Sequence, residues 1–248
     1  IVSRWADENG FERKRNFMIQ ISNLSKKYGE TVVFSDLNYT FENACIYGLV
    51  GRNGAGKTTL LNILSNYDKN YTGVISIDRK KMNKVDYLDM PVAYAMDQPS
   101  FFNELTIYEN LLLIASSRKI KKQEAFDKIE RILDGLGLKK YENYSPLELS
   151  KGTMQRLNNA CAMIQEEKIT IFDEPFSGLD PVQMKLLENV IVEFHKKEKG
   201  IYIISSHDIE CLQNVCDKCL LLHNGQIREI NMEEVDREEI AKILSEGE

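Results

Sequence analysis

The sequence predicts an α/β fold with a mixed, mainly parallel sheet, and three observations support this prediction. Short apolar runs of strand length alternate with amphipathic stretches of helix length, which is typical of parallel strands joined by crossover helices. The chain has 248 residues, of which 43% are hydrophobic and 28% charged, as in an ordinary globular protein. Between about residues 99 and 165 the patterns become purely helical. We therefore expect a helical block inserted into an α/β core.

Strands dominate the first part of the chain. Met18–Asn23 and Val32–Phe41 alternate apolar and polar residues, which predicts two half-buried strands. Cys45–Val50 is continuously apolar, as expected for a strand covered on both faces. Lys57–Leu64 follows with a helical pattern. Further strands are expected at Thr72–Ile77 and Val92–Met96.

The helical block and the segments after it follow in order. Helices are expected at Leu105–Ser116, Lys122–Leu136 and Lys151–Gln165. In the second of these, Ala125, Ile129, Ile132 and Leu133 recur every three or four residues, which places them on one face. After the block, strands are expected at Ile169–Phe172, Ile201–Ser205 and Cys219–Leu222, and helices near Pro181–Glu193, Asp208–Asn214 and Met232–Leu244.

We expect one domain over residues 18–248, preceded by a separate segment at residues 1–17. This segment ends before the first Met and carries the basic run Arg13-Lys14-Arg15, without an apolar core of signal-peptide length. We interpret it as a leftover of protein expression or as a frayed leader. The alternative is an extension that touches lipid headgroups or a partner. No apolar run approaches the roughly 18 residues needed to cross a bilayer. Action at a membrane would therefore require a partner that spans it.

Charge and cysteine content limit the classes of function. The net charge of −6 disfavours a nucleic-acid partner, since nucleic-acid binders carry basic patches or stripes. Five scattered cysteines fit a reducing cytoplasm. The spacing of Cys211, Cys216, Cys219 and His223 superficially suits zinc. Because Cys219 opens an apolar run and Cys216 precedes it at a helix-to-strand turn, buried and inert thiols are favoured.

Residues 51–58 read Gly-Arg-Asn-Gly-Ala-Gly-Lys-Thr and match the phosphate-binding pattern G-x-x-x-x-G-K-[ST] without a gap. Its glycines allow the backbone N–H groups to point inward, and the following helix directs its positive end to the same concavity. Lys57 would supply charge to the β- and γ-phosphates, Thr58 a hydroxyl for Mg²⁺ and Thr59 a donor to the α-phosphate. The predicted nucleotide-binding residues of this loop are Gly51, Asn53, Gly54, Ala55, Gly56, Lys57, Thr58 and Thr59.

Two carboxylates, Asp173 and Glu174, end the apolar run Ile169–Phe172. A strand that ends at the carboxyl edge of an α/β sheet delivers its last residues to the ligand crevice. Asp173 is a hard oxygen ligand suited to Mg²⁺, and Glu174 can orient or deprotonate an attacking water. Such a pair can also simply end a strand or cap a helix. Together with the phosphate loop it predicts hydrolysis of a nucleoside triphosphate.

Leu149-Ser150-Lys151-Gly152-Thr153 precedes the acidic strand and opens a predicted helix. This run resembles the signature of ABC ATPases, usually written L-S-G-G-Q. With the phosphate loop and the acidic pair, it makes residues 18–230 similar to the ATP-binding subunit of an ABC transporter of the exporter type. The resemblance implies a P-loop NTPase core, an N-terminal antiparallel β subdomain and an inserted ABC helical subdomain. It also implies ATP as the nucleotide and Mg²⁺ as the cofactor.

Further positions match family motifs. Tyr28 resembles the aromatic residue that stacks on adenine, and its alternative is an ordinary turn tyrosine. Gln98 resembles the glutamine whose amide reaches Mg²⁺ and the attacking water, with a solvated loop residue as the alternative. His207 resembles the switch histidine that contacts the γ-phosphate, and its alternative is a structural histidine at the end of a strand. Asp180 resembles a loop aspartate that bridges two protomers, but it can equally cap the helix that begins at Pro181.

The signature implies a dimer. In the family, Ser150 and the Gly152 N–H would face the γ-phosphate of ATP bound to the other protomer, so a head-to-tail dimer, most simply a homodimer, is expected to close on ATP. Lys151 and Thr153 depart from the usual Gly and Gln. Lys151 either adds charge near the phosphate or is solvated, and both interpretations stay open. Arg52 stands where Pro is common, and this change removes no catalytic group.

The resemblance implies an ATPase in the cytoplasm, peripheral on the inner face of the cell membrane, that powers a separate membrane-spanning subunit. Export is expected, because S-K-G variants of the signature resemble exporter subunits. A second hypothesis is a soluble ABC ATPase of an assembly pathway, such as iron–sulfur cluster building. A translation or DNA-repair ABC protein is disfavoured by the acidic charge and the single ATPase unit.

Overall fold

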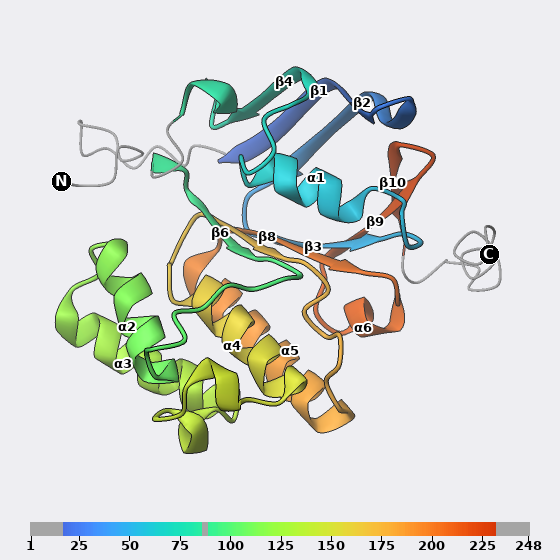
Figure 1. Cartoon of the computed structure of the whole chain (residues 1–248). Helices are drawn as coiled ribbons and strands as arrows, with labels where there is room; N and C mark the ends of the chain where they lie inside the picture. Colours follow the sequence, from blue (N-terminus) through green and yellow to red (C-terminus); the bar gives the residue numbers. More distant parts are fainter. Residues whose placement is uncertain (1–16, 86–88, 232–248) are drawn as a thin grey trace.

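Two β-sheets organise the computed structural model, which describes residues 17–85 and 89–231 (Figure 1). The smaller sheet has the strand order β2-β1-β4-β5, and the larger has the order β10-β9-β3-β8-β7-β6. Helix α1 (Lys57–Leu64) lies between the two sheets, whereas α4 (Lys151–Met163) and α5 (Pro181–Glu198) cover the other face of the larger sheet.

The smaller sheet is antiparallel and is formed by β1 (Met18–Tyr28), β2 (Thr31–Glu42), β4 (Thr72–Ile77) and the short β5 (Lys80–Lys81). It confirms the expected N-terminal antiparallel β subdomain. β1 extends past the predicted end at Asn23, where φ is +51° and the pairing with β2 shifts register. This bulge breaks the alternation of apolar residues, which is why the sequence pattern predicted only the first half of the strand.

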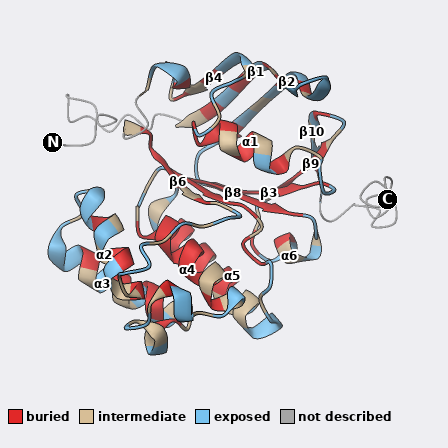
Figure 2. Cartoon of the chain, in the orientation of Figure 1, coloured by how far each residue is buried: buried red, intermediate tan, exposed pale blue. Residues whose placement is uncertain are grey.

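The larger sheet is parallel except at one edge. Its strands are β3 (Cys45–Val50), β6 (Val92–Ala95), β7 (Ile169–Phe172), β8 (Ile201–Ser206), β9 (Lys218–His223) and β10 (Gln226–Ile230). β3, β6, β7, β8 and β9 pair in parallel, and β10 pairs antiparallel to β9. The central strands are buried along their whole length (Figure 2).

Burial on both faces explains the continuous apolar run of β3. Tyr47 and Leu49 pack toward α1 and the smaller sheet, while Ile46 and Val50 pack toward the helices on the opposite face. Buried parallel strands of this kind show no alternation in sequence. The predicted bounds of β3 and of helix α1 agree with the structure.

Strand β10 was not predicted. It follows the turn Asn224-Gly225, where both residues have positive φ, a combination typical of a two-residue hairpin. Because β10 is an edge strand, its residues are largely exposed and its sequence is polar. The apolar pattern on which the strand predictions rested is therefore absent.

Helices α2 (Ile107–Ser117) and α3 (Lys122–Gly135) lie between β6 and α4 in the chain. α2 begins two residues later than predicted because Thr106 caps it: its hydroxyl accepts from the Glu109 N–H at 3.2 Å, and the Glu109 carboxylate accepts from the Thr106 N–H at 2.8 Å. The predicted apolar stripe of α3 is buried. Short 3-10 turns lie at Met82–Lys84, Lys139–Tyr141 and Pro146–Glu148.

Helix ends account for the remaining differences. α5 continues past the predicted Glu193 because Phe194 and His195 are buried, and it ends at Lys199, whose φ is +51°. α6 spans only Glu210–Gln213. The predicted helix Met232–Leu244 lies outside the described residues, as do residues 1–16 of the expected leader. The domain boundaries at 18 and at about 99–165 stay predictions.

Ion pairs connect the helical block to the core, and one of their cations is buried. Lys128 of α3 is 4% exposed, and its Nζ lies 2.6 Å from Glu166 Oε1 and 3.3 Å from Glu198 Oε1. Arg118, which follows α2, lies 3.0 Å from Glu167 Oε1. Adjacent glutamates before β7 therefore hold both helices. In the described parts of the chain, no helix is long and apolar enough to cross a membrane.

Candidate functional site

The loop from Gly51 to Thr58 connects β3 to α1 and has a conformation that requires glycine. Gly54 and Gly56 have φ values of +79° and +101°. A Cβ atom at Gly56 would lie 2.7 Å from Val33 Cγ1, and one at Gly51 would lie 2.8 Å from the Leu222 carbonyl oxygen. The loop therefore packs tightly against β2 and β9, and any side chain at these two positions would displace it.

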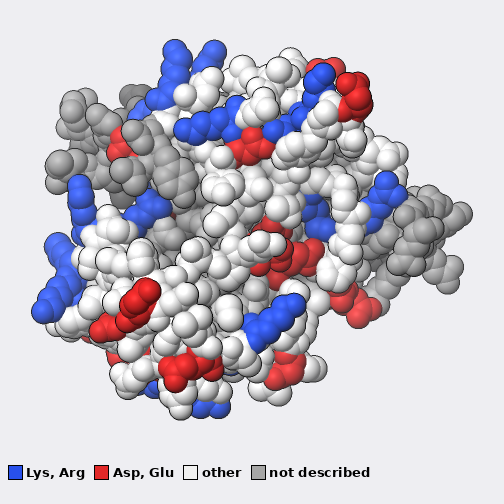
Figure 3. Space-filling view, viewed as in Figure 1, with Lys and Arg blue, Asp and Glu red and all other residues white. Residues whose placement is uncertain are grey.

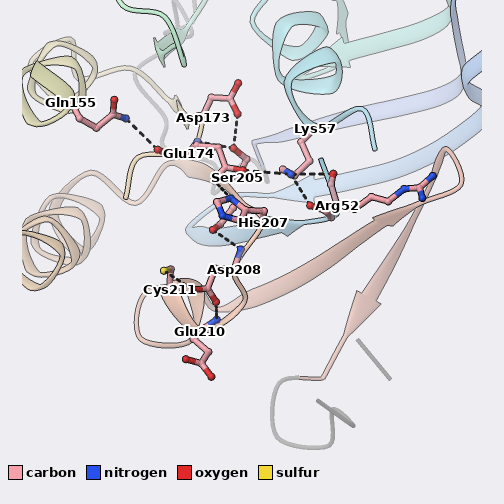
Figure 4. A network of polar contacts seen from close by, with 12 residues as sticks. Arg52, Lys57, Gln155, Asp173, Glu174, Ser205, His207, Asp208, Glu210 and Cys211 are labelled. Atoms are coloured by element: carbon pink, nitrogen blue, oxygen red, sulfur yellow. Dashed lines mark hydrogen bonds and ion pairs between the residues drawn. The ribbon is translucent and has the colours of Figure 1, made fainter. Parts of the chain in front are cut away.

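Lys57 begins α1 and is only 6% exposed. Its Nζ donates to the Gly51 carbonyl at 2.6 Å and to the Arg52 carbonyl at 3.4 Å, and it lies 3.4 Å from Glu174 Oε1 (Figure 4). The ammonium group is thus held beneath the loop, at the N-terminus of the helix. A buried cation beside unpaired helix N–H groups attracts an anion.

A cleft of about 550 Å³ opens over this loop. It is lined by Tyr28, Thr31, Val33, Arg52, Asn53, Gly54, Gly56, Lys57, Thr58, Thr59, Asp97, Glu174, Ser177 and His207. Within the described part of the chain, Gly51, Ala55 and Gln98 do not line it. Gly51 and Ala55 support the loop from behind, whereas Gln98 is exposed and its neighbour Asp97 reaches the cleft.

Asp173 ends β7 and is completely buried beside Thr58. Its Oδ1 accepts a hydrogen bond from Ser205 Oγ at 2.6 Å, and the Thr58 side chain is also hydrogen-bonded to the carboxylate. Burial raises the pKa of the Asp173 carboxyl, although the hydrogen bonds from Ser205 and Thr58 oppose that shift. A carboxylate and a hydroxyl are hard oxygen donors, so this pair fits Mg²⁺.

Glu174 takes a different direction from Asp173. Its φ of +47° is unusual for a residue other than glycine, and the surroundings hold it: its N–H donates to Ser205 Oγ at 2.9 Å and its carbonyl accepts from Gln155 Nε2 at 3.2 Å. Its carboxylate lies between Lys57 and His207, whose Nδ1 is 3.0 Å from Oε2 (Figure 4). The backbone strain thus turns the second acid into the cleft.

The signature residues lie at a different place from the cleft. Ser150 caps α4, with its Oγ 3.3 Å from the Thr153 N–H and 2.9 Å from Thr153 Oγ1. Both residues line a second pocket, of about 510 Å³, that shares no lining residue with the cleft. A Cβ at Gly152 would lie 3.0 Å from the Gly178 carbonyl oxygen. Lys151 is exposed, and its side chain lies beside Gly178.

The capping role that the sequence left open for Asp180 is present, because its Oδ1 accepts from the Gln183 N–H at 2.9 Å at the start of α5. His195 is structural: it is buried, and its Nε2 lies 3.1 Å from the Gly200 carbonyl oxygen. All five cysteines are free thiols. No three His, Cys, Asp or Glu side chains of the described residues converge where a metal ion could be held.

Two residues of the site escaped the sequence patterns. Ser205 joins the two acids by bonding the Asp173 carboxylate and the Glu174 N–H, and Asp97 lines the cleft. Ser205 could have been found from its place at the end of β8, because β8 is the neighbour of β7 in a parallel sheet. The segment around Asp97 has no periodicity from which the direction of its side chain could be inferred.

A glycine-rich loop between a buried parallel strand and a helix, facing an acidic pair at the end of a second strand, defines a P-loop NTPase. A profile of the ABC transporter family matches residues 34–177. An uncharacterised ABC transporter ATP-binding protein of Methanocaldococcus jannaschii is 32% identical over 208 residues, which cover 84% of this chain and 75% of that protein. The chain belongs to the ABC transporter family as an ATP-binding subunit, and it is an ATPase.

Other relatives extend this comparison. The tungstate uptake system ATP-binding protein TupC of Peptoclostridium acidaminophilum is 30% identical, over 85% of this chain and 97% of that protein. The bacitracin transport ATP-binding protein BcrA of Enterococcus faecalis is also 30% identical, over 89% of this chain and 71% of that protein. A solved structure of an ATP-binding subunit of an ABC transporter matches with a TM-score of 0.80 at 27% identity, over 89% of this chain and 92% of that one.

Proposed function

We propose that this chain binds and hydrolyses MgATP in the cleft and thereby powers a separate membrane-spanning subunit, from the cytoplasmic, inner face of the cell membrane. Two copies would act together as a head-to-tail dimer. The observation that carries the proposal is the convergence of Lys57, Glu174 and His207 on one cleft, at the carboxyl ends of neighbouring parallel strands.

The cleft fits a triphosphate. Gly54 and Gly56 supply the left-handed turns that let loop N–H groups face the cleft, and Lys57 supplies the cation. Its present anionic neighbour is Glu174, so a phosphate oxygen would take the place of that carboxylate beside the ammonium group. Mg²⁺, held by Thr58 and Asp173, would supply charge that neutralises the phosphate oxygens.

Glu174 would then orient or deprotonate the attacking water. Backbone hydrogen bonds hold the residue whether or not its carboxylate contacts Lys57, so the carboxylate can act once phosphate has replaced it there. His207 would keep that carboxylate in place through its Nδ1 and contact the γ-phosphate. Gln98 would reach the cleft only by a movement of its exposed segment, which makes it a candidate for coupling hydrolysis to a partner.

The separation of the two halves of the site supports the proposed dimer. Ser150 and Gly152 share no pocket with the phosphate loop of their own chain, so they act on ATP only if a second copy presents its cleft to them. Ser150 stands at the N-terminus of α4, where unpaired N–H groups favour an anion. Loss of the γ-phosphate would remove this contact and let the dimer open.

An exposed apolar surface offers a place for the membrane-spanning subunit. Phe102, Tyr144 and Leu147 are 59%, 45% and 76% exposed. Their segments are joined, because Ser145 Oγ donates to the Asn103 carbonyl at 2.8 Å. Phe102 lies on the segment that begins with Gln98, so this part of the surface would connect a docked partner to the cleft. Export stays a prediction, since the relatives include TupC, which is named for tungstate uptake.

Docking at this surface is tested by copurification from detergent-solubilised membranes. We expect the wild type to carry a membrane-spanning protein with it, and Leu147→Asp to lose that protein without losing ATP affinity. Val74→Asp, at an exposed apolar position of the smaller sheet, should retain it. A chain that never associates with a membrane-spanning protein would exclude the transport role. The other candidate, an ATPase of an assembly pathway, finds no support among these relatives.

A further inference from the structure

Tyr28 stands at the end of β1 with an environment that fixes its ring. The side chain is 53% exposed and lines the cleft. Its hydroxyl donates to Asp68 Oδ2 at 3.1 Å, and Lys26 Nζ lies over the ring at 4.5 Å from the centroid. Lys26 and Tyr28 are two residues apart on β1, and although the pairing with β2 shifts register between Lys26 and Lys27, the contact of Nζ with the ring brings the two side chains together. The hydrogen bond therefore fixes the orientation of the ring, and Lys26 covers one of its faces.

The Lys26 ammonium group contacts the Tyr28 ring, the Asp68 carboxylate and the Asn70 carbonyl. The residue is 4% exposed, its Nζ lies 2.6 Å from Asp68 Oδ2, and it donates to the Asn70 carbonyl at 2.7 Å. Burial opposes ionisation of Asp68, but hydrogen bonds from Lys26, the Asn70 N–H and Tyr28 outweigh it and hold the pKa of that carboxyl below its ordinary value. The cation and the carboxylate thus form a charged pair behind the tyrosine.

The arrangement leaves one face of the ring for a ligand. Lys26 is buried and, among the described residues, does not line the cleft, so the exposed surface of the ring is the one that Lys26 does not cover. A cation over one face draws electron density from the ring, which favours an electron-rich purine on the other face. A ring that is already fixed also loses less conformational freedom when a base stacks on it.

We propose that Lys26 and Asp68 are positioning residues for purine recognition: they fix the Tyr28 ring as a stacking platform and so set how much the base contributes to nucleotide binding. The inference rests on the proposed binding of ATP in the cleft. Neither residue lines the cleft, so the effect is confined to the base and leaves the phosphate contacts of Lys57 unchanged.

Calorimetry with two probes, magnesium ATP and magnesium tripolyphosphate, separates base from phosphate. Tyr28→Ala should weaken ATP binding by about tenfold, because stacking on an aromatic ring contributes at that level. Lys26→Met and Asp68→Asn should weaken it by about threefold to tenfold. Tripolyphosphate affinity should stay unchanged in all three. Lys27→Met, the exposed neighbour on β1, should alter neither affinity.

The outcomes are distinguishable. ATP affinity that is unchanged in Lys26→Met and Asp68→Asn, or that falls together with tripolyphosphate affinity, overturns the positioning role. The same holds if Tyr28→Ala binds ATP as the wild type does. If instead Lys57→Ala leaves both probes bound normally, the proposed function itself fails. Asp68→Asn is nearly isosteric, so it keeps the test available should Lys26→Met not fold.

Discussion

At the scale of single residues, the site depends on opposite environments for two adjacent acids. Asp173 is fully buried against Ser205 and Thr58, whereas Glu174 is turned into the cleft by its positive φ. The sequence places them side by side, and only the backbone separates their roles. A metal ligand and a water-orienting base can therefore occupy consecutive positions.

Lys57→Ala should weaken the binding of magnesium ATP by about tenfold to a hundredfold, since charge-assisted contacts contribute about 1.5–3 kcal/mol. The physical reason is that Lys57 is a buried cation of the cleft. Among the described residues, the one carboxylate that it contacts is that of Glu174, which would give way to phosphate. Calorimetry measures the change. Lys151→Ala, at an exposed lysine that does not line the cleft, serves as the control and should bind ATP normally in the monomer.

Unchanged affinity in Lys57→Ala would mean that the loop does not hold the phosphates. The phosphate loop and the acidic pair could be predicted from the sequence because their motifs stand directly after apolar strands, whereas His207 was predicted from the family resemblance. Asp97 could not be predicted, since its segment has no periodicity, and Ser205 could have been found only from the sheet order that places β8 beside β7.

At the scale of the elements, the agreement depends on burial. Buried strands such as β3 and β7 were predicted with the bounds that they have, because their apolar runs are continuous. The edge strand β10 was missed because its exposed residues are polar, although the Asn224-Gly225 turn is typical of a hairpin. The early end predicted for β1 has its cause in the bulge at Asn23.

The attachment of the helical block gives a prediction at this scale. Lys128→Ala removes the cation from between Glu166 and Glu198, leaving both carboxylates without it. Because the Glu166 side chain is partly exposed, removing the cation costs about 1–2 kcal/mol, which corresponds to a melting temperature lower by about 2–8 °C for a chain of this size. Differential scanning calorimetry measures it. Lys121→Ala, at an exposed position before α3, should shift it little.

A melting temperature of Lys128→Ala equal to that of Lys121→Ala would show that the ion pairs do not hold α3 to the core. A loss in Lys128→Ala that Glu166→Gln reproduces would instead assign the effect to this contact. Glu166 and Glu167, which lie shortly before β7, would then connect the helical block to the strand that carries the acidic pair.

At the scale of the whole molecule, the cleft and the second pocket share no lining residue. The face shown in Figure 3 carries basic and acidic side chains interspersed, rather than one broad area of either sign. Charge on that face alone would therefore not hold two copies together. In the proposed account the triphosphate does so, because it contacts the phosphate loop of one copy and the Ser150 helix of the other.

The most direct test of the account is gel filtration of Glu174→Gln with and without magnesium ATP, beside a measurement of ATP turnover. We expect turnover to fall by at least about a hundredfold, since the water loses its base, while ATP still binds and the protein elutes as a dimer only when ATP is present. Glu210→Gln, an exposed acid of α6, should behave as the wild type. Hydrolysis by Glu174→Gln at the wild-type rate, or a protein that stays monomeric with ATP bound, would contradict the central claim.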